Sequence, residues 1–193
     1  MKELNIRPIG HVKNDKNREI LKFSKDDIEI DEEIIGKQSN NGDISQIIIN
    51  DEYIECLDGI EDFSHLVIVY WTHKTPNQGR NIKKVHPAGI KQMPIKGIFA
   101  TRSPVRPNPI GIISVKFIDK KENILFVEGL DAINNTPVID VKPHLPSYDS
   151  PLNVKLADWM YSIMEKFKKM SPQSHSKDIR YHPCICDEQK NAN

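Results

Sequence analysis

The stretch LVIVYW, residues 66–71, decides the fold class of this 193-residue chain. All six side chains are apolar or aromatic, and a short run of this kind is typical of a strand that is buried on both faces. We therefore expect a strand in the interior of a β-rich domain.

Shorter β-rich segments, each bounded by turn residues, recur through most of the chain. We expect further strands at residues 6–12, 44–49, 96–100, 110–118, 124–128 and 137–141, with a polar hairpin connection at residues 119–123. The expected helices are a short one at residues 51–57 and an amphipathic one at residues 154–170. The sequence thus predicts a mainly β domain, and it has no GxGxxG motif that would indicate a Rossmann-type cofactor site.

Two stretches lack apolar periodicity. Residues 14–43 are polar and rich in charge, and we expect a long surface loop that covers a site or engages a partner. From residue 171 onward we expect a terminal extension. It contains His182, Cys184 and Cys186, but three potential ligands without a CxxC pair are a weak signal, so no metal site is predicted.

Length and composition limit the class of protein. With 38% hydrophobic residues the chain suits one sizeable soluble domain, and no apolar run approaches the roughly 20 residues that span a bilayer. The first ten residues have no signal-peptide core, and three cysteines do not indicate a disulfide framework. We therefore expect a cytoplasmic protein that has no membrane partner.

The net charge of zero conceals an uneven distribution of charge along the chain. Residues 1–62 hold 16 acidic side chains against 8 Lys or Arg, residues 63–118 hold 9 Lys or Arg and no acid, and residues 119–193 hold 11 acids against 10 Lys or Arg. The basic block is either a solvated face balanced by the acidic first third or a face that binds phosphate groups.

The segment KGIFATRSPVRPNPIG, residues 96–111, lies within this basic block. Its three prolines restrict the backbone, so Arg102, Arg106 and Asn108 are held in few conformations. Each arginine offers a planar fork of donors that suits carboxylate or phosphate. The segment is therefore either an anion-binding loop or a stiff turn whose arginines are tied to neighbouring acids or backbone carbonyls.

A second group of polar side chains lies in residues 129–149, GLDAINNTPVIDVKPHLPSYD. Asp131, Asp140, Lys142, His144 and Asp149 alternate with prolines and small residues, and such rigid presentation suits a small-molecule site. The alternative is that Asp140 forms a structural ion pair with Lys142 or Arg102. His65 and His73, at the two ends of the 66–71 strand, are more typical of structural histidines.

Four blocks, taken together and in order, resemble the TrmO/TsaA-like family of S-adenosylmethionine-dependent tRNA methyltransferases. They are PIGHV at residues 8–12, LDGIEDFSHLVIVYWTHK at residues 57–74, ATRSPVRPNPIG at residues 100–111 and TPVIDVKPHLPSYD at residues 136–149. The resemblance implies a single-sheeted β-barrel over residues 1–150 with a few peripheral helices. Residues 151–170 would then be a C-terminal helix that packs on the barrel or on a dimer partner, and residues 171–193 an extension.

The resemblance also implies a homodimer that transfers a methyl group from S-adenosylmethionine to N6 of N6-threonylcarbamoyladenosine, beside the anticodon of threonine tRNA. By family position, the residues expected to contact the cofactor are Asn14, Asp15, Lys16, His73, Lys74, Arg102, Ile112, Asp131, Ala132, Ile133 and Asn134. Arg102, Asp140 and Lys142 are expected to arrange the reaction, and Arg106, Asn108 and His144 to contact the substrate RNA.

The chain departs from the family pattern at three places. Asn134 and Asn135 replace an acid and a turn glycine in the usual DGTP, although Asn tolerates a positive φ and can keep the turn. His144 stands where a tyrosine is usual, and Asn14 and Asp15 replace an SPY motif. Some members also carry a separate C-terminal domain, where this chain has one expected helix and an extension.

The expected reaction needs positioning above all, because methyl transfer from a sulfonium requires the nucleophile, methyl group and sulfur in line. Arg102 or Lys142 would stabilise the anion that develops at the target nitrogen, and Asp140 would accept its proton or hold the lysine. Two other hypotheses remain: a methyltransferase of this family with another acceptor, and a non-catalytic module that binds S-adenosylmethionine or tRNA.

Overall fold

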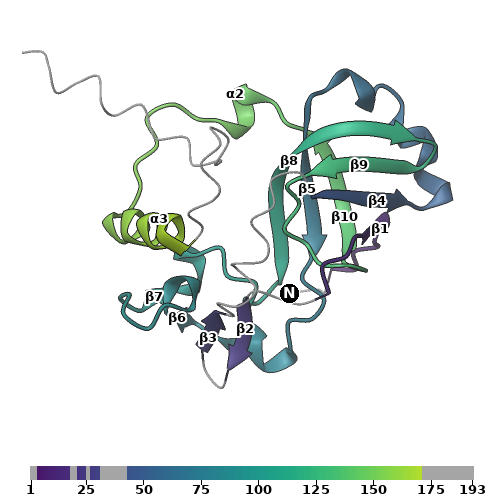
Figure 1. The fold of residues 1–193 in the computed structure, drawn as a ribbon. Helices are drawn as coiled ribbons and strands as arrows, with labels where there is room; N and C mark the ends of the chain where they lie inside the picture. Colours follow the sequence, from purple (N-terminus) through teal and green to yellow (C-terminus); the bar gives the residue numbers. More distant parts are fainter. Residues whose placement is uncertain (1–3, 18–20, 25–26, 31–42, 171–193) are drawn as a thin grey trace, which may run out of the picture.

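Six strands form a closed barrel in the computed structural model, which describes residues 4–17, 21–24, 27–30 and 43–170. The barrel strands are β1 (Gly10–Lys13), β4 (Ile44–Ile49), β5 (His65–Trp71), β8 (Ile110–Lys121), β9 (Ile124–Glu128) and β10 (Pro137–Pro143). Their order around the barrel is β1-β10-β5-β8-β9-β4, and every neighbouring pair is antiparallel (Figure 1). The predicted mainly β, single-sheeted barrel is confirmed.

The core of the barrel follows from the alternation of side chains along its strands. Every second residue of β4 and β9 is buried, so each of these strands turns one apolar face inward. In β5 both faces are buried at Leu66, Val67 and Ile68, as the apolar run predicts. The shared interior contains thirteen buried side chains from Val12 to Val138.

Gly10 marks the place where β1 comes closest to β4. A Cβ atom on this residue would lie 2.2 Å from the carbonyl oxygen of Ile48, so only glycine fits here. The register pairs Gly10 with Ile49 on β4 and with Val138 on β10. Gly10 therefore allows β1 to close the barrel between these two strands.

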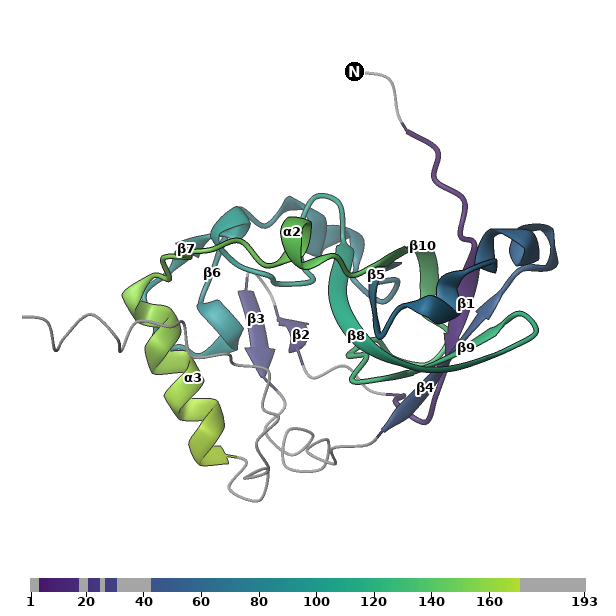
Figure 2. The same cartoon turned by 90° about the horizontal axis from the view of Figure 1, so that it is seen from above.

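A smaller region with a core of its own lies outside the barrel, and we call this region the lobe. It comprises residues 72–109 together with the β2–β3 ladder, and its five buried side chains are Ile28, Ile82, Val85, Ile98 and Val105. Its elements are β2 (Leu21–Ser24), β3 (Asp27–Ile30), η3 (Asn77–Asn81), β6 (Lys84–Val85), η4 (Pro87–Gly89), β7 (Lys96–Gly97) and η5 (Ile98–Ala100), where η denotes a 3-10 helix. Both cartoon views place these strands beside the barrel (Figures 1 and 2).

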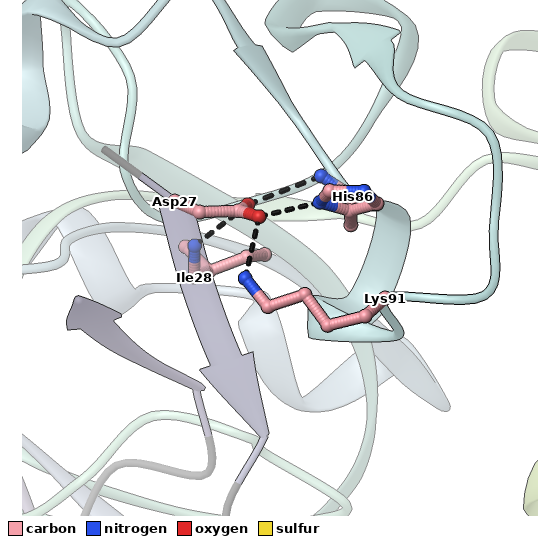
Figure 3. A network of polar contacts seen from close by, with 4 residues as sticks. All are labelled: Asp27, Ile28, His86 and Lys91. Atoms are coloured by element: carbon pink, nitrogen blue, oxygen red, sulfur yellow. Dashed lines mark hydrogen bonds and ion pairs between the residues drawn. The ribbon is translucent and has the colours of Figure 1, made fainter. Parts of the chain in front are cut away.

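A carboxylate network fastens β3 to the rest of the lobe (Figure 3). The Oδ1 atom of Asp27 accepts hydrogen bonds from the backbone N–H groups of Ile28 and His86 at 2.8 and 3.1 Å. Its Oδ2 atom accepts one from the Lys91 ammonium at 2.7 Å and contacts the His86 ring at 2.5 Å. Burial alone would raise the pKa of Asp27, but the hydrogen bonds lower it to about 2. The carboxylate therefore stays ionised and holds the ladder in place.

The remaining helices lie at the periphery. They are η1 (Asp51–Leu57), η2 (Ile60–Asp62), α2 (Pro146–Asp149) and α3 (Asp158–Met170). In α3, Ile163 is buried and the apolar residues Trp159, Met160, Met164 and Phe167 are half-buried, as is Leu156 just before the helix. None of the helices in the described ranges is long and apolar enough to cross a membrane.

Several local predictions were wrong. Part of the expected surface loop at residues 14–43 is the β2–β3 ladder, whose Ile28 is buried in the lobe despite its polar neighbours. Residues 98–100 form a 3-10 turn rather than the end of a strand, since the strand hydrogen bonds end at Gly97. The first strand starts at Gly10 and the long helix at Asp158, both four residues later than expected. His182, Cys184 and Cys186 lie outside the described residues.

Candidate functional site

Most of the predicted cofactor-binding residues meet at one end of the barrel. Because neighbouring strands are antiparallel, the ends of β1 and β5 lie at the same end of the barrel as the beginnings of β8 and β10. The segments next to these four strand ends carry Asn14, Asp15 and Lys16; His73 and Lys74; Arg102 and Ile112; and Asp131, Ala132, Ile133 and Asn134. Residues far apart in the sequence thus share one neighbourhood.

The loop after β1 and the loop before β10 are locked together by hydrogen bonds. The Asn14 side-chain amide donates to the Ala132 carbonyl and to the buried Ser45 hydroxyl, both at 3.0 Å. The Lys16 ammonium donates to the Leu130 carbonyl at 2.8 Å, and the Asn134 N–H donates to the Lys16 carbonyl at 2.7 Å. These contacts give the two loops a defined shape.

The turn that departs from the family pattern is intact. Asn135 adopts a left-handed backbone conformation with φ of 62°, as expected for an asparagine in place of a turn glycine. The Asn134 side-chain oxygen accepts a hydrogen bond from the Asn14 N–H at 3.1 Å. An amide oxygen is a sufficient acceptor for this bond, so the loop keeps its shape with no carboxylate at Asn134.

Tyr70 and Asp131 form the polar centre of this end of the barrel. The Tyr70 hydroxyl donates to the Asp131 carboxylate at 2.6 Å across 61 residues of sequence. Burial raises the pKa of Tyr70, and the Asp131 charge and hydrogen bond raise it further, while the Arg102 charge lowers it. The hydroxyl thus remains a donor at any physiological pH.

Gly111 makes room for the Tyr70 ring. The two residues face each other in the β5–β8 ladder, and a Cβ atom on Gly111 would lie 2.3 Å from the Tyr70 Cζ atom. The missing side chain at Gly111 leaves room for the phenol ring, whose hydroxyl donates to Asp131. Sequence reasoning did not select Tyr70 or Gly111, although a hydroxyl-bearing aromatic near the end of an aliphatic buried strand was an available signal.

Arg102 is fixed by the barrel wall. Its Nη2 atom donates to the Ile112 carbonyl at 2.7 Å, while its side chain stays exposed. Across the described part of the chain, no carboxylate forms an ion pair with it. Arg102 thus matches one of the two interpretations of its loop, a tie to a backbone carbonyl, with further donors of its fork left for a ligand.

His73 and Lys74 connect β5 to the lobe. The Lys74 ammonium donates to the Asn17 carbonyl at 3.2 Å, which places it beside the loop after β1. The Nδ1 atom of His73 is buried and has no hydrogen-bond partner within the residues that the structure describes. Burial lowers the pKa of His73, and the Lys74 charge lowers it further, so the ring is neutral at pH 7.

Asp140 and Lys142 lie farther along β10 than the loop before it that carries Asp131 and Asn134. Their side chains form an ion pair of 2.6 Å that is partly exposed to solvent. Asp140 is opposite Val69, which is itself opposite Ile112, so two strand spacings, roughly 10 Å, separate Asp140 from the residue that holds Arg102. The ion pair with Lys142, one of the predicted alternatives, is present.

His144 lies at the opposite end of the barrel. Its Nδ1 atom is 2.9 Å from the Ser114 hydroxyl and 3.8 Å from an oxygen of Asp149, and its ring centroid is 6.3 Å from that of His65. The structure therefore does not bring His144 together with the predicted cofactor-binding residues. Its role in RNA binding stays a prediction.

The proline-rich loop that carries Arg106 and Asn108 is held from both sides. Thr72 donates through its hydroxyl to the Pro109 carbonyl at 2.9 Å, and Thr75 donates to the Pro104 carbonyl at 3.3 Å. Val105 is buried in the lobe. The loop therefore joins the end of β5 to the lobe, with Asn108 exposed and Arg106 half-buried.

Comparison with known proteins identifies the family to which the chain is similar. A family model described as the tRNA-methyltransferase O (TrmO) N-terminal domain matches residues 32–150, which is more than half of the chain. The chain belongs to the TrmO N-terminal domain family. The predicted family is thereby confirmed.

Relatives of this TrmO-family chain include archaeal and human proteins. A probable S-adenosyl-L-methionine-binding protein of Methanocaldococcus jannaschii is 42% identical over 118 residues, which cover 61% of this chain and 94% of the relative. One of Methanothermobacter thermautotrophicus is 38% identical over 77% of this chain and 95% of the relative. A human tRNA (adenine(37)-N6)-methyltransferase is 37% identical over 62% of this chain, but this covers only 27% of the human protein.

The fold of the TrmO-family chain is shared with a solved structure. A crystal structure of TrmO from Pseudomonas aeruginosa superposes with a TM-score of 0.59 at 23% sequence identity. The match covers 81% of this chain and 64% of that one. The solved protein therefore contains a further third that this match does not cover.

Proposed function

We propose that this chain is an S-adenosylmethionine-dependent methyltransferase that acts on N6 of N6-threonylcarbamoyladenosine next to the anticodon of tRNA, with threonine tRNA as the expected substrate. The observation that carries the proposal is the convergence of four strand-end segments beside Tyr70, Asp131 and Arg102. The names of the relatives support it, since the archaeal proteins are named for S-adenosylmethionine binding and the human protein for methylation of tRNA adenine.

The groups at this end of the barrel fit the cofactor. S-adenosylmethionine carries an ammonium, a carboxylate, ribose hydroxyls and an adenine, and it supplies an electrophilic methyl group when bound. Arg102 offers donors for an anionic group, and the exposed Asp131 offers an acceptor for hydroxyl or amino groups. The buried Nδ1 atom of His73, which has no hydrogen-bond partner among the described residues, fits the same interpretation, since a buried polar atom in a native protein normally has a partner.

Positioning and charge are what this chain contributes to the reaction. The target nitrogen lies between a purine and a carbonyl, so its proton is acidic. A nearby cation stabilises the anion that forms when this proton leaves. The hydrogen bond and the charge of Asp140 raise the pKa of Lys142, which keeps Lys142 a cation at neutral pH. Asp140 accepts the proton or only holds Lys142, and Arg102 is the second cation available.

A transfer assay tests the function. The chain is incubated with methyl-labelled S-adenosylmethionine and total tRNA from cells that lack their own enzyme of this kind. We expect label in threonine tRNA, and we expect none when the tRNA also lacks the threonylcarbamoyl group. Transfer to adenosine without that group would contradict the proposed acceptor.

Two variants test the residues assigned to the reaction. Asp140→Asn removes the proton acceptor and weakens the hold on Lys142, whereas Lys142→Ala removes the cation. Each is expected to lower the rate of transfer by roughly a hundred-fold without changing cofactor affinity. Wild-type rates in both variants would remove Asp140 and Lys142 from the reaction.

A non-catalytic module that binds S-adenosylmethionine is the second candidate. It is favoured by the loss of the usual acid at Asn134 and by the archaeal relatives, which are named for binding alone and are covered almost in full by this chain. Calorimetry with the cofactor separates the two candidates: tight binding without transfer to any tRNA would support the module.

We also propose that the chain is a cytoplasmic homodimer. Phe99 and Ile112 are 78% and 51% exposed, and both are near Arg102, which follows Phe99 by three residues and donates to the Ile112 carbonyl. Two apolar side chains next to the site suit a second copy. Light scattering of the purified chain at several concentrations measures its mass, and a mass of one chain throughout would contradict the dimer.

A further inference from the structure

Arg80 is held against an aromatic ring at the junction of the barrel and the lobe. Its guanidinium carbon is 5.3 Å from the ring centroid of Trp71, the last residue of β5, and both side chains are half-buried. A cation over an indole ring is favoured by the charge distribution of the ring, and this contact limits the positions that the guanidinium samples. Arg80 thus presents a preorganised cation, whereas a free surface arginine would sample many rotamers.

The donors of Arg80 have no acceptor in the described part of the chain. Its Nε atom is buried without a hydrogen-bond partner, and no hydrogen bond or ion pair joins Arg80 to another described residue. A buried donor without an acceptor costs free energy, so natural proteins keep few of them and commonly have a use for those that remain.

The proline-rich loop that carries Arg106 packs on the 3-10 helix that carries Arg80. A Cβ atom on Gly79 would lie 3.2 Å from a methyl carbon of Val105, so η3 packs directly on this loop. Arg80 follows Gly79 in sequence and Arg106 follows Val105, so each arginine is next to a residue of this one contact. The hydrogen bonds from Thr72 and Thr75 to loop carbonyls hold that contact in place.

No described carboxylate neutralises this pair of arginines. Residues 63–118 contain no Asp or Glu, and Asp27, the acid that pairs with cations of this block in the lobe, is bound by His86 and Lys91. Neither Arg80 nor Arg106 forms an ion pair with a residue in the described ranges. Two such guanidinium groups on rigid backbone suit an oxyanion with two oxygens.

We propose that Arg80, positioned by Trp71, and Arg106 together bind one backbone phosphate of the RNA substrate. The inference rests on the proposed function and adds to it a docking contact outside the reaction centre. A phosphodiester offers one non-bridging oxygen to each arginine, and phosphate contacts fix the register of a nucleic acid on a protein. A carboxylate, of the cofactor or of the threonylcarbamoyl group, presents the same chemistry and is distinguished by the test.

The test measures the dissociation constants of tRNA and of S-adenosylmethionine separately. Arg80→Gln and Arg106→Gln are compared with Arg7→Gln, a matched change at an exposed arginine before β1, at the opposite end of the barrel. We expect each of the first two to weaken tRNA binding by roughly ten- to a hundred-fold, and to lower the slope of log affinity against log salt by about one. Cofactor affinity and the affinity of Arg7→Gln for tRNA should stay within two-fold of wild type.

Two further variants keep the proposal falsifiable if Arg80→Gln fails to fold. Arg80→Lys keeps the charge but loses the planar fork, and it should lose most of the affinity. Trp71→Phe keeps a ring under Arg80 and should lose less. Wild-type affinity in Arg80→Lys, or affinity within two-fold of wild type in Arg106→Gln, would overturn the proposal.

Three ligands distinguish the possible sources of the anion: S-adenosylmethionine, tRNA with the threonylcarbamoyl group and tRNA without it. Weaker cofactor binding with unchanged tRNA binding would assign the arginines to the carboxylate of the cofactor. Loss of affinity only for threonylcarbamoylated tRNA would assign them to the carboxylate of the threonylcarbamoyl group. Either result would overturn the proposal that they bind a backbone phosphate. If wild-type protein neither binds nor methylates tRNA, the proposed function fails. If wild type is active and the arginine variants bind tRNA normally, only this inference fails.

Discussion

The barrel and the lobe reach a stable structure in different ways. The barrel closes six strands into one continuous ladder around thirteen buried side chains, whereas the lobe surrounds five buried side chains with two-stranded ladders and 3-10 turns. The lobe compensates with specific polar contacts, above all the Asp27 network of Figure 3. Its stability therefore depends on a few named interactions, and that of the barrel on its shared core.

The candidate site and the proposed phosphate contact belong to different regions. Tyr70 and Asp131 belong to the rigid end of the barrel, while Arg80 and Arg106 are carried by the lobe. The comparison predicts that changes in the barrel affect the whole chain, and that changes in the lobe affect RNA binding first.

Glycine substitutions should give the largest contrast. Gly10→Ala places a methyl group 2.2 Å from the Ile48 carbonyl oxygen, so β1 must separate from β4, and we expect the free energy of unfolding to fall by about 3 kcal/mol or more. Gly97→Ala, in the lobe ladder, meets nothing within 4 Å and should raise stability by about 0.5 kcal/mol. Urea unfolding of both variants measures the difference, and equal stabilities would contradict the close approach at Gly10.

The same core truncation made in each region tests whether the two cores unfold together. Val127→Ala in the barrel and Val105→Ala in the lobe each remove two methyl groups from a buried site, at a cost of about 2 kcal/mol. In Val127→Ala we expect hydrogen exchange to speed up throughout the chain. In Val105→Ala we expect hydrogen exchange to speed up mainly in β3, β6 and β7. A uniform increase throughout the chain in this variant would show that the lobe has no separate stability.

Acid should loosen the lobe before the barrel. The pKa of Asp27 is lowered from 3.8 to about 2, so its stabilising contribution is complete above pH 4 and is lost as the pH falls through 2. Asp27→Asn should remove about 1 kcal/mol from the lobe at pH 7 and abolish this acid dependence. Hydrogen exchange of β3 amides between pH 4 and 2 in both proteins checks this, and parallel profiles would exclude Asp27 as the cause.

The smallest effect is expected where the barrel meets the site. Tyr70→Phe removes the hydrogen bond to Asp131 but keeps the ring against Gly111, so stability should fall by only about 0.5–1 kcal/mol. Cofactor affinity should fall several-fold, because Asp131 loses the donor that orients it. Gly111→Ala is the contrasting variant, since its methyl group would displace the Tyr70 ring itself. Calorimetry measures the cofactor affinity of both variants and of wild type. Equal affinities in all three would show that Tyr70 does not contribute to cofactor binding.

The strands were predictable where the apolar pattern is local. Residues 44–49 and 124–128 were predicted with the bounds that the structure shows, because strict burial of alternate residues leaves a clear apolar signal. The β2–β3 ladder was missed because its strands are only four residues long and lie within a charge-rich stretch. Among its described side chains Ile28 is buried, and it packs with Phe23 and with residues from the range 82–105. The 3-10 turn at residues 98–100 was missed because its apolar side chains also suit a strand.

The candidate site was predictable only as a set of segments. Family motifs indicated residues 14–16, 73–74, 102 and 131–134, and the antiparallel barrel brings these segments to one end. Tyr70 beside Asp131 and Arg80 on Trp71 could not be predicted, because those contacts depend on strand register and on the path of the lobe.

The sequence alone determined the mainly β character of this protein, its family and its basic block without acidic residues, since each is a property of residue types and their order. The tertiary structure decided which cations are neutralised, which are held by a ring or a carbonyl, and which ends of which strands meet. The physical reason is that hydrogen bonds, ion pairs and stacking act over a few ångströms, and only the closed barrel and the lobe packed beside it set those distances.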